Sequence, residues 1–327
     1  MSLMLNGKLQ TDWLDAELEN GEFIRQDSQF RNWVTSDGKA GLSGDDGFKA
    51  ESNRYHLYVS HACPWAHRTL IFRKLKKLDG VISVSVVHPH MGNKGWSFGS
   101  FPGAKGDTLY SHKYLHELYT RSDSKYTGIV TVPVLWDKQH QTIVNNESSE
   151  IIRMLNSSFN EWSDNLTDYY PDNLRETIDN INKRIYDNVN NGVYRTGFAH
   201  TQQAYEKNYD RLFNTLDFLE DLLSKTRYLT GAQITEADWR LFTTLIRFDV
   251  VYVGHFKCNK CRISDYPNLY NYMLELYQWP GIAETVNFEH IKQHYYYSHV
   301  ELNPTQIVPK GPEQNLMQVH NRNRIAA

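Results

Sequence analysis

The sequence SHACPWAHR at residues 60–68 separates two different patterns of side chains. Residues 55–60, YHLYVS, are rich in β-forming side chains and predict a strand. Beyond Pro64, apolar residues recur at helical spacing as far as Leu78 and predict a helix. Residues 81–87, VISVSVV, are apolar enough to form a buried second strand. A strand, a helix and a second strand within about 35 residues predict a β-α-β unit.

The pattern that follows extends this unit and then changes character. We expect a helix over 108–122, a strand over 130–136 with Pro133 inside it, a turn at 137–141, a returning strand over 142–144 and a helix over 147–155. This order is typical of the thioredoxin-like fold. After Phe159 no strand pattern remains, and the periodic segments that predict helices are 174–189, 202–225, 236–250, 268–277 and 287–297. The predicted architecture is therefore an α/β domain followed by an all-helical domain.

Both ends of the chain differ in composition from these two domains. Residues 1–50 are irregular and rich in glycine, but Phe23, Phe30 and Trp33 provide apolar anchors, so we expect an ordered arm. Residues 301–327 contain three prolines and predict a mobile tail. The predicted divisions are the arm at 1–50, the thioredoxin-like domain at 51–160, the helical domain at 161–300 and the tail at 301–327.

The composition excludes several classes of protein. The 327 residues carry 35 Lys and Arg against 38 Asp and Glu, a formal net charge of −3, so we expect neither nucleic acid nor a membrane surface as a partner. No apolar stretch reaches the roughly 18 residues of a transmembrane helix, and residues 1–13 lack the apolar core of a secretory signal. Three cysteines cannot form a disulfide framework. These features predict a cytoplasmic protein.

Cys63 is the strongest candidate for chemistry. With Pro64 favoured at the first helical position, Cys63 is expected at the N-cap, facing the free N–H groups of Trp65 and Ala66. The helix dipole contributes about 0.3–1 kcal/mol, or up to about one pKa unit, towards the nucleophilic thiolate. The alternative is a small buried cysteine that merely begins a helix. Because Ala66 replaces the second cysteine of a Cys-x-x-Cys pair, an external thiol such as glutathione must resolve any adduct on Cys63.

Two further motifs accompany Cys63. Val132-Pro133 places a proline within a predicted strand, which indicates an edge, a bulge or a cis bond; a cis proline there leaves the preceding backbone able to pair with an extended peptide. At 145–149, NNESS begins a helix, where Ser148 and backbone N–H groups suit a carboxylate and Glu147 suits an ammonium group. The alternatives are an ordinary edge-strand proline and an ordinary N-cap.

Other reactive side chains have simpler interpretations. His67 lies four residues after Cys63 on one helical face, where a structural role is favoured over that of a base. His255, Cys258 and Cys261 fall within seven residues, but zinc needs four ligands and no second cysteine pair exists. We expect no metal site and interpret both cysteines as incidental surface thiols.

Several motifs together resemble the cytosolic glutathione transferases. They are CPWAHR at 63–68, VP at 132–133, NES at 146–148, and YLTG and TEAD between 228 and 238. A narrower resemblance, to the Xi class or glutathionyl-hydroquinone reductases of the bacterial type, is carried by FRNW at 30–33, NGVY at 191–194, VYV at 251–253 and HY at 294–295. The resemblance extends from about residue 10 to about residue 310 and implies the glutathione transferase fold and a homodimer formed through the helical domain.

The resemblance also implies a set of site residues. Cys63 is the nucleophile, Tyr194 the proton donor, and Tyr252 and Tyr295 point towards the sulfur and lower its pKa. In the run Tyr295-Tyr296-Tyr297 the register of this role could shift by one. The residues implied to contact glutathione are Trp96, Ile129, Val130, Thr131, Val132, Glu147 and Ser148, with Ile129 standing where relatives can carry a basic residue.

The implied reaction is the reduction of a glutathionyl-hydroquinone to its hydroquinone, with glutathione as co-substrate and no metal. A Cys63–glutathione mixed disulfide forms and a second glutathione releases it as oxidised glutathione. One alternative is another thiol transferase that reduces dehydroascorbate or removes glutathione from protein thiols. A second is a non-catalytic binding module.

Overall fold

The computed structural model describes residues 2–10, 18–19 and 21–325. Its contacts divide the chain into two units, each made of separate stretches of sequence. The first comprises Met1–Leu14, Gln26–Thr167 and Thr285–Ser298, as far as these are described. The second comprises Asp15–Arg25, Asp168–Glu284 and His299–Ala327. The domain limits predicted at 50, 160 and 300 assume continuous segments, whereas each unit combines separate stretches of sequence. These limits therefore stay predictions.

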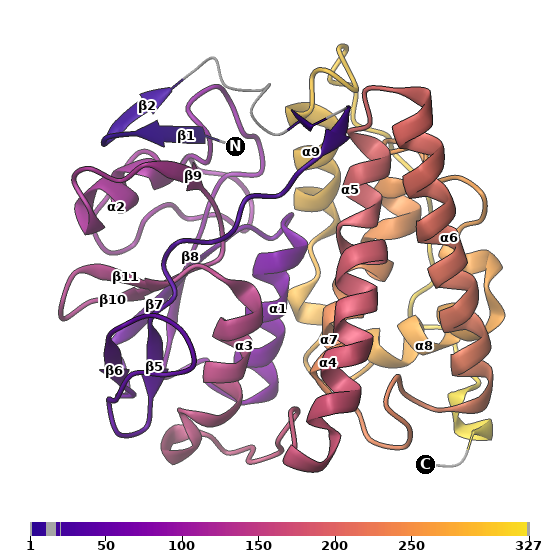
Figure 1. Cartoon of the computed structure of the whole chain (residues 1–327), viewed down its shortest axis with the longest axis horizontal. Coiled ribbons are helices and arrows are strands. Elements are labelled where there is room, and N and C mark those ends of the chain that lie inside the picture. The colour runs from indigo at the N-terminus through magenta and orange to yellow at the C-terminus, as the bar shows by residue number, and fades with distance from the viewer. Residues whose placement is uncertain (1, 11–17, 20, 326–327) are drawn as a thin grey trace. The chain divides into compact units, whose positions relative to one another are not determined.

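A four-stranded sheet forms the centre of the first unit, in the order β11-β10-β7-β8 (Figure 1). Helix α1 connects the parallel strands β7 and β8, while β10 runs antiparallel to both β7 and β11. All five residues of β7 are buried. The predicted β-α-β unit and hairpin are confirmed. The bounds are β7 (Tyr55–Val59), α1 (Pro64–Leu75), β8 (Ser83–Val86), β10 (Val134–Asp137) and β11 (Thr142–Asn145).

A second sheet comes from the segment that was predicted to be irregular. Strands β1 (Ser2–Leu5) and β2 (Lys8–Gln10) form a hairpin, and β1 also pairs with β9 (Gly128–Val130). The hairpin turns through Asn6-Gly7, both at positive φ, and a Cβ on Gly7 would clash with the carbonyl oxygen of Ser124. The strands are too short for clear alternation, which explains the wrong prediction. Two more pairs are β3 (Leu18–Glu19) with β4 (Glu22–Phe23) and β5 (Trp33–Thr35) with β6 (Gly47–Lys49).

Two predicted elements have different limits in the structure. The strand predicted over 130–136 is two strands, since β9 ends at Val130 and β10 begins at Val134, with a cis Val132–Pro133 peptide between them. The helix predicted from 108 begins only with α2 (Leu115–Ser122), because the Asp107 carboxylate accepts hydrogen bonds from the N–H groups of Leu109 and His112 and holds that stretch in a turn. Helix α3 (Ser148–Ser157) lies beside α1.

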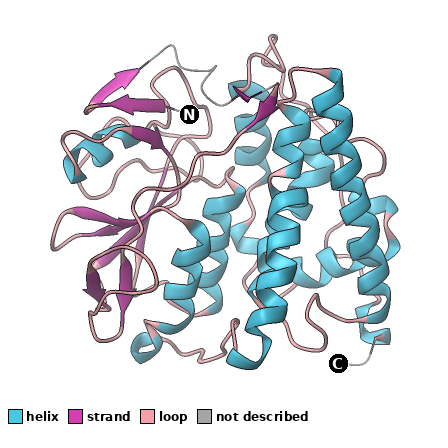
Figure 2. Cartoon of the chain, in the orientation of Figure 1, coloured by secondary structure: helices cyan, strands magenta, loops and turns pink. Residues whose placement is uncertain are grey.

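Helices build the second unit, apart from the short β3–β4 pair (Figure 2). Thr235 and Asp238 form a capping box at the start of α7, in which the Thr235 N–H donates to the Asp238 carboxylate over 2.8 Å. The helices are α4 (Arg175–Ile185), α5 (Gly192–Gly197), α6 (Gln202–Lys225), α7 (Glu236–Arg247) and α8 (Pro267–Tyr277). Short π-helical turns at Tyr186–Asn190 and Phe248–Tyr252 extend α4 and α7. Single 3-10 turns of the second unit lie at Asp172–Leu174, Ile263–Asp265 and Arg322–Arg324, while the turn at Asn160–Trp162 belongs to the first unit and the turn at Ala283–Thr285 spans the division between the two. The last helix, α9 (Phe288–Ser298), belongs to the first unit.

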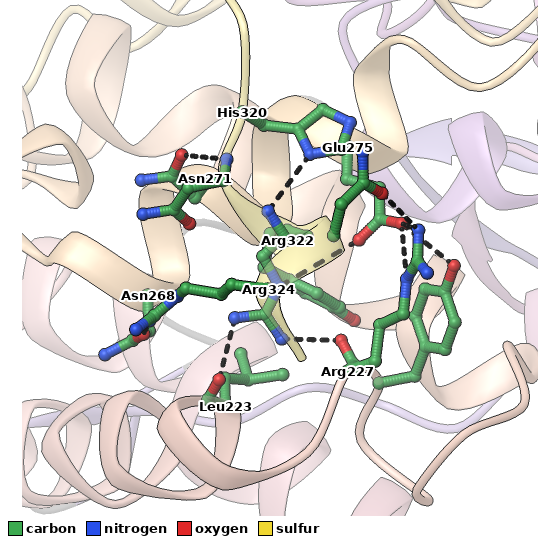
Figure 3. Close-up of polar contacts among 12 residues, drawn as sticks. Leu223, Arg227, Asn268, Asn271, Glu275, His320, Arg322 and Arg324 are labelled. Atoms are coloured by element: carbon green, nitrogen blue, oxygen red, sulfur yellow. Dashed lines mark hydrogen bonds and ion pairs between the residues drawn. The ribbon is translucent and has the colours of Figure 1, made fainter. Parts of the chain in front are cut away.

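The C-terminal segment is not the mobile tail that its prolines predicted. Arg322 is completely buried in the second unit, and its guanidinium donates to the carbonyl oxygens of Leu223, Thr226 and Arg227 over 2.6–2.7 Å (Figure 3). The Leu223 oxygen lies in the last turn of α6 and the other two directly follow it, where helix carbonyls lack intrahelical partners. A distant arginine therefore caps α6 and fixes the segment that carries it.

Candidate active site

Cys63 lies between the buried strand β7 and the first turn of α1. It is the N-cap residue, with φ −73° and ψ 122°, and Pro64 occupies the first helical position, as predicted. The side chain is half-buried. Its Sγ lies 3.6 Å from the carbonyl oxygen of Val132 and makes no capping hydrogen bond to the first turn of α1. The predicted contact of the sulfur with the helix N–H groups is thus replaced by one in which the thiol donates to a carbonyl.

Thr131, which directly precedes Val132, and Asn146 come together around the hydroxyl of Tyr119. This buried phenol donates to the Thr131 carbonyl oxygen over 2.8 Å and accepts from the Thr131 N–H and from the Asn146 side-chain amide, both over 3.2 Å. Burial raises the pKa of Tyr119, which keeps it a neutral donor. The sequence analysis did not select Tyr119, because nothing local distinguishes it among 21 tyrosines. It fixes the segment that places Val132 beside Cys63.

Glu147 and Ser148 occupy the N-terminal end of α3. The Glu147 carboxylate accepts from the backbone N–H of Ser149 over 3.0 Å and from the hydroxyl of Ser28 over 3.3 Å. Ser148 is buried, and its hydroxyl accepts from the Arg68 guanidinium over 3.3 Å. Glu147 thus caps α3, and its carboxylate retains further acceptor positions, so its predicted contact with a ligand stays a prediction. Arg68, also missed from the sequence, brings a buried positive charge to this end of α3.

Ile129 and Val130 belong to strand β9, at one edge of the second sheet. Their backbones face Leu3 and Ser2 of β1 in an antiparallel register. Ile129 is buried, so its side chain is part of the core of the first unit. The contacts with glutathione that the resemblance implied for these two residues stay predictions.

Trp96 and Tyr295 also lie in the first unit, with His294 between them. The indole of Trp96 stacks on the His294 ring at a centroid separation of 4.7 Å and an interplanar angle of 25°. The rings of His294 and Tyr295 meet edge to face at 5.3 Å. Among the three consecutive tyrosines, Tyr295 is 1% exposed, whereas Tyr297 is 37% exposed and stacks on His90. Burial thus distinguishes Tyr295 from its neighbours, while its approach to the Cys63 sulfur stays a prediction.

Tyr194 and Tyr252 lie together in the second unit. Their ring centroids are 6.2 Å apart at an angle of 59°, and Tyr252 is fully buried. The Arg25 guanidinium lies 5.1 Å from the Tyr194 ring centroid, and its Nε–H donates to the Asn191 side chain over 2.8 Å. Arg25 was not selected from the sequence, since its 169-residue distance from Tyr194 leaves no local pattern. The predicted approach of Tyr194 and Tyr252 to the Cys63 sulfur stays a prediction.

The remaining candidates have structural surroundings. His67 is buried, and its Nε2 lies 2.8 Å from the hydroxyl of Thr285, which fits the structural role favoured for it. Cys258 is fully buried, so its interpretation as a surface thiol was wrong; burial raises its pKa well above the ordinary value. Cys261 is half-buried. Across the described residues, no three or more His, Cys, Asp or Glu side chains are grouped so that they could hold a metal ion.

Comparison with known proteins identifies the family. The family models "Glutathione S-transferase, N-terminal domain" and "Glutathione S-transferase, C-terminal domain" match residues 62–158 and 202–275. The chain is 56% identical to glutathionyl-hydroquinone reductase YqjG of Escherichia coli K-12 over 98% of both proteins, and 50% identical to glutathionyl-hydroquinone reductase PcpF of Sphingobium chlorophenolicum over 97% of this chain and 98% of that protein.

Solved structures agree with these relatives. The Xi-class glutathione transferase of Natrialba magadii has a TM-score of 0.91 and 45% identity, covering 100% of this chain and 98% of that one. The glutathione-bound structure of YqjG has a TM-score of 0.90 with 54% identity, covering 98% of this chain and 99% of that one. This chain therefore belongs to the glutathione transferase family, in its Xi class of glutathionyl-hydroquinone reductases. The family resemblance and the fold class predicted from the sequence are confirmed. Within the described residues, no helix is both long and apolar enough to cross a membrane.

Proposed function

We propose that this chain reduces glutathionyl-hydroquinones to hydroquinones at the expense of glutathione, with Cys63 as the nucleophile. The observation that carries the proposal is the placement of Cys63 at the N-terminus of α1, 3.6 Å from the backbone of Val132. A helix N-terminus favours a thiolate, and a thiolate is the form of cysteine that attacks sulfur. The relatives YqjG and PcpF, at 56% and 50% identity, are named for this same reaction.

In the first step the Cys63 thiolate attacks the sulfur that joins glutathione to the aromatic ring. A sulfur–sulfur bond forms and the carbon–sulfur bond breaks, with its electron pair passing to the ring carbon. That carbon takes a proton from Tyr194, whose phenol is placed by Arg25 and Asn191. The products are the hydroquinone and a disulfide between Cys63 and glutathione.

In the second step a thiolate of free glutathione attacks the glutathione sulfur of this disulfide. Oxidised glutathione leaves, the Cys63 thiolate is restored, and the proton released by the incoming glutathione replaces the one that Tyr194 gave up. The sum is one glutathionyl-hydroquinone and one glutathione converted to one hydroquinone and one oxidised glutathione. The described part of the chain has a single cysteine in the CPWA turn, so an external thiol is required for this step.

We assign the bound glutathione to polar and backbone groups of the first unit, which also contains Cys63. Val132 offers backbone next to the sulfur, while Glu147 and Ser148 offer a carboxylate and a hydroxyl for the amino and carboxylate groups of the γ-glutamyl end. The buried guanidinium of Arg68 behind Ser148 adds positive charge for that carboxylate. Trp96, Ile129, Val130 and Thr131 complete the proposed set.

One experiment tests the substrate, the two products and the role of Cys63. The protein is incubated in D₂O with the substrate and excess glutathione, and hydroquinone and oxidised glutathione are quantified by chromatography with mass detection. We expect equal amounts of both products and one deuterium in the hydroquinone, at the carbon that carried sulfur. Cys63→Ala should abolish turnover, whereas the matched variant Cys261→Ala, which removes another half-buried thiol, should retain it.

Tyr194→Phe separates this reaction from other thiol-transferase chemistry. Carbon–sulfur cleavage needs a proton on carbon, whereas exchange between disulfides needs none on carbon. Loss of hydroquinone formation with retained reduction of a glutathione mixed disulfide supports the proposal. Equal loss of both activities in Tyr194→Phe would contradict the role of Tyr194 as proton donor. If the wild-type protein shows no turnover but still carries glutathione on Cys63, disulfide substrates are favoured. Absence of both turnover and adduct favours a binding module.

The proposal includes the homodimer and the cytoplasmic location that the resemblance implied. A dimer formed through the helical domain should sediment at twice the mass of one chain at micromolar concentration. A monomer that turns over at the full rate would remove the dimer from the proposal and leave the chemistry intact. Reduced glutathione, the co-substrate, requires a reducing compartment.

A further inference from the structure

Trp96 and His294 form a buried stacked pair within the first unit. Their ring planes are only 25° from parallel, and the two residues are 4% and 7% exposed. Trp96 lies in the loop after β8, and His294 lies on α9, nearly two hundred positions later in the chain. One face of the indole is therefore covered by a side chain from the C-terminal part of the sequence.

The imidazole of His294 is itself held in a fixed orientation. Its Nδ1 lies 2.9 Å from the carbonyl oxygen of Pro89. Because a carbonyl oxygen only accepts, Nδ1 carries the proton in this contact. Pro89 follows β8, an edge strand of the four-stranded sheet, by three residues, so the ring is tied to the edge of that sheet. The indole thus stacks on a ring that cannot turn without losing a buried hydrogen bond.

Helix α9 is fastened to the same loop on both sides of Trp96. Before it, the Nε2 of His90 lies 2.7 Å from the Gln293 side chain, and the Met91 N–H donates to the Ser298 hydroxyl over 2.9 Å. After it, the Nε2 of His290 lies 2.6 Å from the carbonyl oxygen of Pro102. The loop and the helix therefore form one packed body around the indole.

We propose that His294 is a positioning residue that orients Trp96 for glutathione. The inference rests on the proposed function, which makes Trp96 a glutathione contact, and adds what holds that contact in place. The backbone of Trp96 is fixed through its carbonyl oxygen, which accepts from the Leu115 N–H over 2.9 Å, but the rotation of the indole is set by its stacking partner. With one face of the ring against His294, glutathione uses the other face or the edge.

Three variants of His294 separate the two contributions of its side chain. Phe keeps an aromatic ring for the stack and removes the donor to Pro89. Asn keeps a donor near the position of Nδ1 and removes the ring, and Ala removes both. The matched control is His290→Ala, which removes another helix-to-loop hydrogen bond of α9, the one to Pro102, and leaves the stacked pair intact.

The measurement is the dissociation constant of glutathione by titration calorimetry, which does not depend on turnover. We expect roughly a three- to tenfold rise for His294→Ala and for Asn, a smaller rise for Phe, and no change for His290→Ala. In the Trp96→Ala background, His294→Ala should add nothing further. The KM for the glutathionylated substrate should rise in parallel, while kcat at saturation is retained.

Three results would overturn the inference. One is that all His294 variants bind glutathione with the wild-type dissociation constant while Trp96→Ala binds it more weakly. A second is an equal weakening by His290→Ala, which would mean that attachment of α9 in general is what matters. The third is a Trp96→Ala variant with full affinity, which removes the glutathione contact itself. Since affinity is measured without substrate, a protein that binds glutathione normally but fails to turn over rejects the proposed reaction alone.

Discussion

The Cys63 sulfur lies 3.6 Å from the carbonyl oxygen of Val132, a residue 69 positions later in the chain. Each partner is placed by a buried element: Cys63 by the transition from β7 to α1, and Val132 by the segment that Tyr119 holds between β9 and β10. The position of the sulfur is therefore set by the core of the first unit. A reactive group fixed in this way loses little freedom when it meets a bound partner.

The three cysteines should differ widely in reactivity. Cys63 lies at a helix N-terminus, Cys261 is half-buried, and Cys258 is fully buried with a pKa well above its ordinary value. The N-terminus of α1 favours the thiolate of Cys63 by about 0.3–1 kcal/mol, which corresponds to roughly two- to fivefold more thiolate at a given pH. With iodoacetamide at pH 6.5, peptide mapping should find Cys63 modified roughly two- to fivefold faster than Cys261. Cys258 should react only after unfolding in urea.

Labelling of Cys258 in the folded protein at the rate of Cys261 would contradict its burial. Equal rates for Cys63 and Cys261 would contradict an activating effect of the α1 N-terminus. A Cys63→Ser variant identifies the modified peptide and serves as the control for the assignment.

Arg25 should affect cleavage of the aromatic thioether more than exchange of disulfides. Its guanidinium lies 5.1 Å from the Tyr194 ring centroid and is anchored on Asn191, so it fixes the phenol that is proposed to donate the proton. A cation–π contact of about 0.5–2 kcal/mol predicts roughly a two- to thirtyfold lower kcat for Arg25→Ala with a glutathionyl-hydroquinone. Reduction of a mixed disulfide should be unchanged. Both reactions are measured on the same preparation.

Lys207→Ala is the matched control for this change. It removes another positive charge that is bound to the same N-terminal segment, through the Lys207–Glu22 ion pair. If it lowers thioether cleavage as much as Arg25→Ala does, the effect comes from the docking of the segment and not from Tyr194.

Local pattern explains what could be predicted from the sequence. The cysteine before Pro64, the periodic helix after it and the β-forming side chains of residues 55–60 are properties of neighbouring residues, so the β-α-β unit and the N-cap position of Cys63 were accessible. The same applies to the capping box of Thr235 and Asp238, whose two members are three residues apart. The family motifs then extended these local signals to a complete site.

Contacts between distant polar residues leave no such pattern. Arg25, Tyr119 and His294 are placed by partners far along the chain, and each is chemically ordinary in its own sequence neighbourhood. The strand predicted over 130–136 failed for a related reason, because its apolar residues belong to two different sheets. Prolines in 301–327 indicate only that no helix can run through them, and the burial of Arg322 depends on α6 and α8.

Stability should fall as the pH is lowered from about 6.5 towards 4. Burial lowers the pKa of His56 and of His255 to about 4, against about 6.5 in the unfolded chain. Between these values the unfolded chain binds protons that the folded protein does not, so the free energy of unfolding is highest above about pH 6.5 and decreases below it. Each histidine contributes up to about 1.4 kcal/mol per pH unit in this range.

The buried carboxyls Asp238 and Asp249 act in the opposite direction, since burial raises their pKa values and favours the folded state as the pH falls. The histidine contribution is therefore isolated by comparing variants. Urea unfolding is measured at pH 7 and pH 5 for the wild type, for His56→Asn and for His255→Gln. Each variant should lose less stability between the two pH values than the wild type does, and curves parallel to the wild type would contradict the buried, neutral state of that histidine.

The largest loss of stability should follow the removal of Arg322. Its guanidinium satisfies three carbonyl oxygens behind α6 and lies 3.9 Å from the Glu275 carboxylate, which also accepts from Arg227 and Tyr228 (Figure 3). Arg322→Ala leaves buried carbonyls unsatisfied and Glu275 without one cation, so we expect about 3–5 kcal/mol lower stability in urea unfolding. Arg322→Lys keeps the charge but cannot reach all three oxygens, and should recover only part of it.

Arg324→Ala provides the comparison two residues away. Arg324 is exposed and bonds to the side chain of Asn268, so its removal should change the free energy of unfolding by no more than about 0.5 kcal/mol. If Arg322→Ala has the same free energy of unfolding as Arg324→Ala, the stabilising role assigned to Arg322 is contradicted. A large loss for Arg322 alone would establish that Arg322 holds the end of α6 against α8, because its three carbonyl partners lie in and just after the last turn of α6 and Glu275 belongs to α8.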